Sequence, residues 1–195
     1  MYIVLDCGHS KKTPGKRSPK LEDGTRFLEY EYNRKLGKLI GDKLTEMGVE
    51  WCFTCDIDDE NDMSLTSRAN VANEKAKIYG YRNVLLISIH HNALGNGEEW
   101  YDADGWSVWT TNGETISDRY AKTATRAAKE VLEPLGIRVR GEYEQNFTVI
   151  FKTVCPSILI EYGFYTNKKE VKWLMSEEGL QANCDATIRM IEKMI

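Results

Sequence analysis

Three short runs along the chain consist mostly of apolar residues. They cover residues 2–6, 83–89 and 157–160, and they are rich in Val, Ile and Leu. Strands that are hydrophobic on both faces are typical of a sheet covered by helices on both sides, whereas a half-exposed strand alternates apolar and polar residues. The three runs therefore predict buried strands at the centre of an α/β domain.

Segments with apolar residues at helical spacing lie between and after these strands. They predict helices over residues 31–47, 64–79, 115–132 and 177–194. Shorter strands are expected over residues 50–54, 105–110 and 147–151, and residues 11–28, which contain two prolines, are expected to form a loop. The order of strands and helices predicts an α/β three-layer sandwich, with a mixed, mostly parallel, twisted sheet flanked by helices. With 195 residues and no linker, one domain is expected over residues 1–195.

Composition and charge narrow the classes of function. The formal net charge is −4, whereas nucleic-acid-binding proteins usually carry a basic excess, so no nucleic-acid partner is expected. No apolar run approaches the roughly 18 residues of a membrane span, which predicts no membrane insertion. The N-terminus lacks the regions of a signal peptide, which predicts a cytoplasmic protein at synthesis. Five cysteines in a chain of this size predict free thiols, and the Cys52 and Cys55 pair has no partner pair for a metal site.

Each of the three buried strands ends near a side chain that can bind a metal or move a proton. His9 follows the first strand, His90 and His91 follow the second, and Glu161 follows the third. In open α/β sheets, ligand sites form at the carboxyl ends of the strands, so these residues are expected to converge. Imidazoles and carboxylates suit zinc, whose catalytic sites use about three protein ligands and keep one position open.

Glu29 and Glu31 are the candidates for a further metal ligand. Both lie where the loop of residues 11–28 meets the first predicted helix. Residues two apart on a helix face different directions, so one of them can face the site while the other faces solvent. The spacing alone leaves open which one does so, and it leaves the reaction open as well.

Four sequence blocks occur along the chain in a specific order. They are Asp6-Cys7-Gly8-His9-Ser10, Glu29-Tyr30-Glu31-Tyr32-Asn33, Ser88-Ile89-His90-His91-Asn92-Ala93 and Leu159-Ile160-Glu161-Tyr162-Gly163-Phe164-Tyr165-Thr166-Asn167. In this order they resemble the signature blocks of the zinc-dependent N-acetylmuramoyl-L-alanine amidases of the amidase-3 type. The family pattern begins Asp-Pro-Gly-His-Gly, so Cys7 and Ser10 depart from it, while Gly8 and His9 are kept.

The resemblance implies a role for each residue that matches the family pattern. It implies that His9, Glu29 and His90 bind one zinc ion and that Glu161 is the catalytic glutamate. It implies hydrolysis of the amide bond between N-acetylmuramic acid and L-alanine in peptidoglycan, with water activated by zinc and by the glutamate as general base.

Two ambiguous positions are also assigned by the resemblance. The ligating glutamate of the family precedes an asparagine by four positions, as Glu29 precedes Asn33, so Glu29 is preferred to Glu31. His91 then falls at a variable position of its block, and a structural or substrate-facing role is expected for it.

The resemblance further suggests which residues frame the substrate groove. These are Asn92, Trp100, Arg140 and Asn146. A monomer is expected. The alternatives are a zinc peptidase of similar architecture, carboxypeptidase-like or aminoacylase-like, and a non-catalytic cell-wall-binding module. Without a signal peptide, the chain is similar to phage or prophage lysins, which act on the cell wall after holin-type release.

Overall fold

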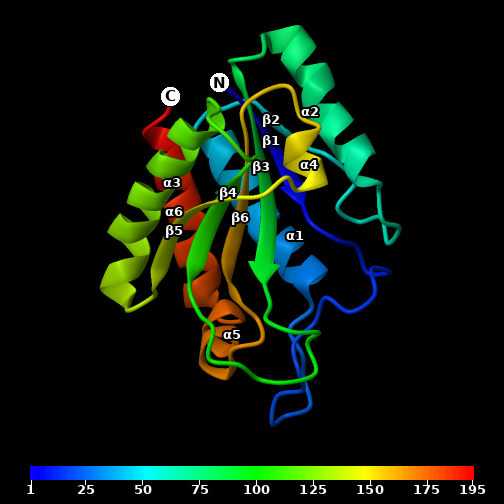
Figure 1. Ribbon diagram of the computed structural model, residues 1–195, viewed down its shortest axis with the longest axis vertical. Coiled ribbons are helices and arrows are strands. Elements are labelled where there is room, and N and C mark those ends of the chain that lie inside the picture. Colours follow the sequence, from blue (N-terminus) through cyan, green and yellow to red (C-terminus); the bar gives the residue numbers. More distant parts are fainter.

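A six-stranded sheet runs through the middle of the protein in the computed structural model, which describes residues 1–195 (Figure 1). The strands are β1 (Tyr2–Cys7), β2 (Trp51–Phe53), β3 (Val84–Asn92), β4 (Trp106–Thr110), β5 (Val139–Glu144) and β6 (Ser157–Phe164). Their order is β2-β1-β3-β6-β4-β5, and every neighbouring pair is parallel except β4 with β6. The sheet is mixed and mostly parallel, and the predicted α/β fold class is confirmed.

Helices cover both faces of the sheet. They are α1 (Glu29–Glu46), α2 (Leu65–Tyr79), α3 (Ser117–Leu132), α4 (Thr148–Phe151), α5 (Lys168–Leu174) and α6 (Glu177–Glu192). α1, α3 and α6 pack against one face, and α2 and α4 against the other, which makes three layers (Figure 1). α2 and α6 begin after serines, because the side chains of Ser64 and Ser176 accept hydrogen bonds from backbone N–H groups of the first turn.

Side chains of the central strands alternate between the two helical layers, because successive residues of a strand point to opposite faces. In β1, Ile3 and Leu5 belong to the core beneath α1, whereas Tyr2 and Val4 belong to the core beneath α2. The same alternation in β3 and β6 buries apolar residues on both faces, which accounts for the continuous apolar runs. α2 and α4 cover only part of their face, and the carboxyl ends of β3 and β6 open there into a cavity.

The structure differs from the sequence-based prediction at three elements. Residues 147–151, predicted to be a strand, form α4 instead, since a short apolar run is compatible with either structure. β5 is absent from the prediction, because its sequence Val-Arg-Gly-Glu-Tyr-Glu has a single aliphatic residue. α5 is absent as well, because seven residues are too few to show helical periodicity.

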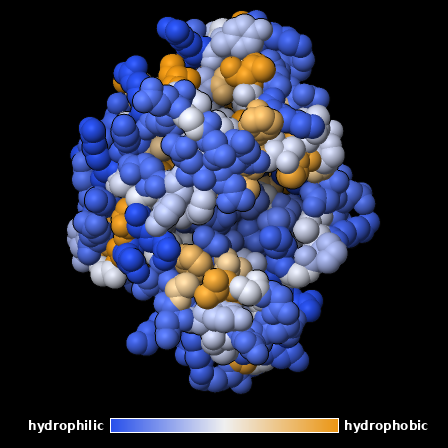
Figure 2. Space-filling model, viewed as in Figure 1, coloured by the Kyte–Doolittle hydropathy of each residue, from blue (hydrophilic) through white to orange (hydrophobic).

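The surface shown in Figure 2 is largely hydrophilic, with exposed apolar residues in small separate groups. None of the helices combines the length and the apolar character needed to cross a bilayer. All five cysteines are free, as the sequence predicted.

A buried ion pair joins β1 to α2. Arg68 Nη1 donates a hydrogen bond to Asp6 Oδ1 at 2.9 Å, and both side chains are 1% exposed. Asp6 also accepts hydrogen bonds from the hydroxyl groups of Ser88 and Thr54, each at 2.6 Å. Burial opposes the negative charge of Asp6, but Arg68 and the two hydroxyl groups outweigh it and lower the pKa of Asp6 below its ordinary value.

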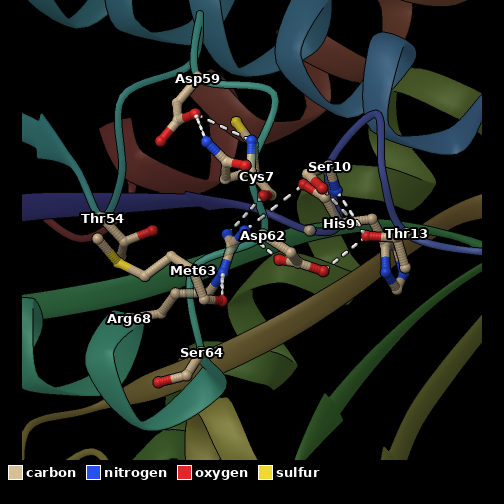
Figure 3. A network of polar contacts seen from close by, with 12 residues as sticks. Cys7, His9, Ser10, Thr13, Thr54, Asp59, Asp62, Met63, Ser64 and Arg68 are labelled. Carbon is tan, nitrogen blue, oxygen red and sulfur yellow. Dashed lines mark hydrogen bonds and ion pairs between the residues drawn. The ribbon is translucent and has the colours of Figure 1, made fainter.

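Arg68 also holds the chain segment that follows β1. Its Nη1 donates to the carbonyl oxygen of Cys7 at 2.7 Å, and its Nη2 lies 3.1 Å from Asp62 Oδ1. Asp62 in turn accepts a hydrogen bond from Thr13 at 2.6 Å. In Figure 3, Arg68 and Asp62 lie beside the segment that carries His9. One planar guanidinium group therefore connects the start of α2 to the end of β1 and, through Asp62 and Thr13, to the loop that follows β1.

Asp6→Asn is expected to lower the free energy of unfolding by about 3 kcal/mol at neutral pH, because it leaves the charge of Arg68 buried without its partner. The pKa of Asp6 is lower in the folded state, so its contribution is complete above about pH 4 and is lost as the pH falls through the folded-state pKa. Urea denaturation of both proteins over a range of pH measures this, and the difference between them should shrink below about pH 4.

The exposed pair of Glu74 and Lys77 provides a control, because Glu74→Gln should change the unfolding free energy little at any pH. A difference between the wild type and Asp6→Asn that stayed constant down to acid pH would contradict the role assigned to Asp6.

Candidate active site

A cavity of about 630 Å³ lies at the carboxyl ends of β1, β3 and β6, on the face that α2 and α4 partly cover. Its walls come from the loop after β1, the first residue of α1, the ends of β3 and β6, and α4 with the residues before it. The sheet edge where the sequence predicted a site is thus the edge where the structure has its cavity.

His90 and His91 point to opposite faces of the sheet because they are consecutive residues of β3. His90 belongs to the face that opens into the cavity, with Glu161 as its register partner in β6. The His91 ring lies near the rings of Phe27 and Tyr162, with centroid distances of 4.9 and 5.8 Å. Burial lowers the pKa of His91 to about 3, so its ring is neutral.

His9 reaches the cavity from a strained backbone position. Its φ is 65°, in the left-handed region that residues with a side chain rarely adopt. The preceding residue must be glycine, because a Cβ atom at Gly8 would lie 2.2 Å from Cε1 of His90. The rings of His9 and His90 meet edge to face, with centroids 4.9 Å apart. The glycine of the Gly-His pair in the sequence block is therefore required by the close approach of the His90 ring.

Glu29 is the first residue of α1, and it is buried between the two histidines. Its Oε1 lies 3.3 Å from His9 Nε2 and 3.2 Å from His90 Nδ1, and it accepts a hydrogen bond from the backbone N–H of His91. Burial opposes the charge of Glu29, but the contacts with His9 and His90 outweigh it and hold its pKa below the ordinary range. Glu31 instead lies on the exposed side of α1 and pairs with Lys35 at 2.7 Å.

The three side chains that meet here fit a zinc ion. One ligand atom from each of His9, Glu29 and His90 lies within 4.8 Å of the other two, and no other cluster of this kind occurs in the chain. In a tetrahedral zinc site with bonds of about 2.0–2.1 Å, neighbouring ligand atoms are about 3.3 Å apart, close to the distances around Glu29 Oε1. Two imidazoles and one carboxylate are also the donor set of catalytic zinc sites that keep one position open.

Glu161 faces the same cavity from β6. Its Oε2 atom is buried and has no hydrogen-bond partner within the protein, which is uncommon for a buried polar atom. Burial raises the pKa of Glu161 to about 8, and the nearby charge of His90 opposes this increase. The site thus contains a carboxyl oxygen whose hydrogen-bonding capacity no group of the protein satisfies.

Asn33 links the segments that carry His9, Glu29 and His90. Its Nδ2 donates to the carbonyl oxygen of Gly8 at 2.9 Å, and its Oδ1 lies 2.8 Å from Nδ1 of His91. Asn33 lies one turn after Glu29 in α1, so the helix places both side chains against the ends of β1 and β3. The Glu-to-Asn spacing of the sequence block therefore has a structural reason, and His91 has a structural contact.

Cys7 and Ser10, the departures from the family pattern, are buried and have local contacts. A Cβ atom at Gly37 would lie 2.4 Å from the Sγ atom of Cys7, which shows how closely this thiol packs against α1. The backbone N–H of Ser10 donates to Oγ1 of Thr13 at 2.9 Å and thereby closes the turn after His9.

Two of the four predicted substrate-binding residues line the cavity and two do not. Asn92 and Asn146 line it. Trp100 packs against the aromatic cluster of Phe27 and Tyr165, outside the cavity. Arg140 also lies outside it, since its guanidinium is 5.3 Å from the ring centroid of Phe164 and donates to the backbone.

Arg68, Lys16 and Tyr165 were not predicted from the sequence as residues of the site. Lys16 and Tyr165 line the cavity, and Arg68 is buried beneath the segment that carries His9. A signal for Arg68 exists in the sequence, because it precedes Ala72 by four residues and therefore lies on the apolar face of its helix. No comparable signal marks Lys16, which lies in an irregular loop.

The sequence matches the Amidase_3 family, described as N-acetylmuramoyl-L-alanine amidase, over residues 3–193. The uncharacterized protein YqiI of Bacillus subtilis (strain 168) is 26% identical over 193 residues, which cover 97% of this chain and 82% of that protein. The N-acetylmuramoyl-L-alanine amidase CwlM of Bacillus licheniformis is 28% identical over 181 residues, which cover 92% of this chain and 63% of that protein. This chain thus spans less than two thirds of CwlM.

Among solved structures, the crystal structure of N-acetylmuramoyl-L-alanine amidase from Clostridium difficile 630 superposes with a TM-score of 0.82 at 25% identity, over 98% of this chain and 95% of that chain. The six-stranded sheet and its helical layers are therefore those of a known amidase, as the sequence blocks implied. Because the family match extends over nearly the whole chain, this protein belongs to the N-acetylmuramoyl-L-alanine amidase family and is an amidase of peptidoglycan.

Proposed function

We propose that this chain hydrolyses the amide bond between N-acetylmuramic acid and L-alanine with one zinc ion held by His9, Glu29 and His90, and with Glu161 as the general base. The observation that carries the proposal is the position of the buried, unpartnered Glu161 Oε2 in the same cavity as the three clustered ligand atoms. The substrate is the peptidoglycan of the cell wall, which is then the place where the enzyme acts.

A zinc ion in this position would polarise the carbonyl group of the scissile amide and lower the pKa of water toward neutrality. His9 and His90 would hold the ion with their imidazoles, whose Nε2 and Nδ1 atoms respectively face Glu29 Oε1. Glu29 offers Oε1, while the backbone N–H of His91 holds the carboxylate in place. The contact of His91 with Asn33 fixes the backbone on the far side of β3, which keeps His90 oriented toward the cavity.

Glu161 moves the proton in the proposed reaction. Its carboxylate accepts a proton from the water molecule that attacks the carbonyl carbon of the lactyl group. The C–N bond then breaks, and Glu161 returns the proton to the nitrogen atom of L-alanine, which leaves as an amine. The products are a muramic acid carboxylate and a stem peptide with a free N-terminal L-alanine. Asn92 and Asn146, which line the cavity, provide amide groups that can orient the substrate.

Glu29→Gln is expected to lower zinc affinity by at least about a hundredfold, because a neutral amide replaces a charged ligand at the centre of the cluster. Zinc per chain after dialysis, measured by elemental analysis, gives the occupancy. Thermal unfolding with and without a chelator gives a second measure, since a bound metal stabilises the folded state.

Glu31→Gln is the matched control, because Glu31 lies two residues further along α1 and its exposed side chain pairs with Lys35, away from the histidines. It should bind zinc like the wild type. Full zinc occupancy in Glu29→Gln, or its loss in Glu31→Gln, would refute the assignment.

Glu161→Gln is expected to keep zinc and to lower the hydrolysis rate by about 10²-fold to 10⁴-fold, because the glutamine cannot accept the proton. The assay follows new N-terminal amines released from purified peptidoglycan and identifies the terminal residue. New N-terminal L-alanine distinguishes the amidase from a peptidase of similar architecture. Undiminished hydrolysis by Glu161→Gln would sink the proposed role of Glu161.

A further inference from the structure

Lys16 is the one lysine or arginine among the residues that line the active-site cavity. Its neighbours Lys11, Lys12 and Arg17 each contact an acidic or amide side chain of another loop. Lys16 has no hydrogen bond or ion pair of its side chain within the protein, and it is exposed at the rim of the cavity. A cation that no internal partner neutralises is therefore available to a ligand in this cavity.

The backbone at Lys16 is fixed although the side chain is free. Its φ is 33°, a left-handed conformation that is unfavourable for a residue with a side chain. The carbonyl oxygen of Lys16 accepts a hydrogen bond from the backbone N–H of Glu29 at 2.9 Å, and Arg17 forms a bridge with Leu28. The loop thereby places Lys16 directly beside the residue that begins α1 and carries a proposed zinc ligand.

The positive charge of Lys16 acts on the volume in which the reaction takes place. Glu29 and Glu161 contribute two carboxyl groups to the cavity. Burial raises the pKa of Glu161, and Lys16 is close enough to oppose this increase. The charged carboxylate of Glu29 would repel an anionic substrate, and the ammonium group of Lys16 reduces this repulsion.

The stem peptide of peptidoglycan carries a charge close to the bond that is cleaved. The residue after L-alanine is D-glutamate joined through its γ-carboxyl group, so its α-carboxyl group is either free or blocked as an amide. An extended residue spans at most about 3.6 Å, so this group lies within about two residues, or roughly 7 Å, of the scissile bond. Carboxylates at the far end of the stem are several residues further away.

We propose that Lys16 forms a carboxylate-binding position that holds the free α-carboxylate of the second stem residue and so favours stems that are not amidated there. This inference rests on the proposed function, because it places the stem peptide in the active-site cavity. Binding by Lys16 would add a substrate preference to that function, because peptidoglycans differ in whether the α-carboxyl group of the second stem residue is a carboxylate or a carboxamide.

Two muramoyl peptides that differ only in this α-carboxylate or α-carboxamide group provide the test. We expect Lys16→Met to raise KM for the carboxylate peptide about fivefold and to leave kcat and the KM of the carboxamide peptide nearly unchanged, as for a hydrogen bond between exposed charged groups. Lys16→Arg should retain most of the preference, because it keeps the charge. Lys20→Met is the matched control, since Lys20 is an exposed lysine of the same loop that does not line the cavity.

Binding measured in the absence of turnover separates this inference from the proposed function. Calorimetric titration of zinc-loaded Glu161→Gln, with and without Lys16→Met, gives the Kd of each peptide, and only the carboxylate peptide should lose affinity. The role of Lys16 would be overturned if Lys16→Met changed the Kd of both peptides equally or changed neither. A fall in kcat with both peptides would also overturn it. If the wild type cleaved neither peptide at the lactyl amide, the proposed function would fail, while the Kd values would still decide whether Lys16 recognises the carboxylate.

Discussion

The buried contact between Asp6 and Arg68 is the interaction on which the arrangement of the active site depends. A fully buried ion pair adds little net stability compared with well-packed apolar residues, because both charges lose their hydration. The pair matters here because it fixes the orientation of the Arg68 guanidinium, which also binds the carbonyl oxygen of Cys7 and the carboxylate of Asp62. Arg68 Nη2 also lies 3.5 Å from the carbonyl oxygen of His9, so the same guanidinium supports the residue with the strained, left-handed backbone.

Two elementary features of β-structure then assemble the rest of the site. Parallel strands bring their carboxyl ends to one edge, so residues far apart in the sequence, such as His9 and His90, become neighbours. The alternation of side chains decides which of them share a face. The side chains of His90 and Glu161 face the cavity together, while the ring of His91 contacts Asn33 of α1 in the opposite layer. Two consecutive histidines therefore have different environments and different tasks.

Much of the fold and of the site could be predicted from local patterns. The three apolar runs are buried strands because the sheet is covered on both faces, and their terminal residues lie in the cavity because such edges remain open. Short elements escaped prediction or were assigned wrongly, since β5 has too few apolar residues and α4 has a composition compatible with strand or helix. Trp100 illustrates a different limit, because an aromatic residue in a loop can stack on a ligand or pack inward, and here it packs inward.

The sequence by itself determined the order of strands and helices, the residue types available for metal chemistry and the signature blocks that identify the family. Each of these depends on local composition or spacing, which the chain carries before it folds. Only the tertiary structure decided that Glu161 has an oxygen without a protein partner and that Lys16 lines the cavity. It also placed Glu29, which the signature block favoured over Glu31, between the histidines. These facts depend on how helices and loops from distant parts of the chain pack against one sheet edge, and no local pattern specifies that packing.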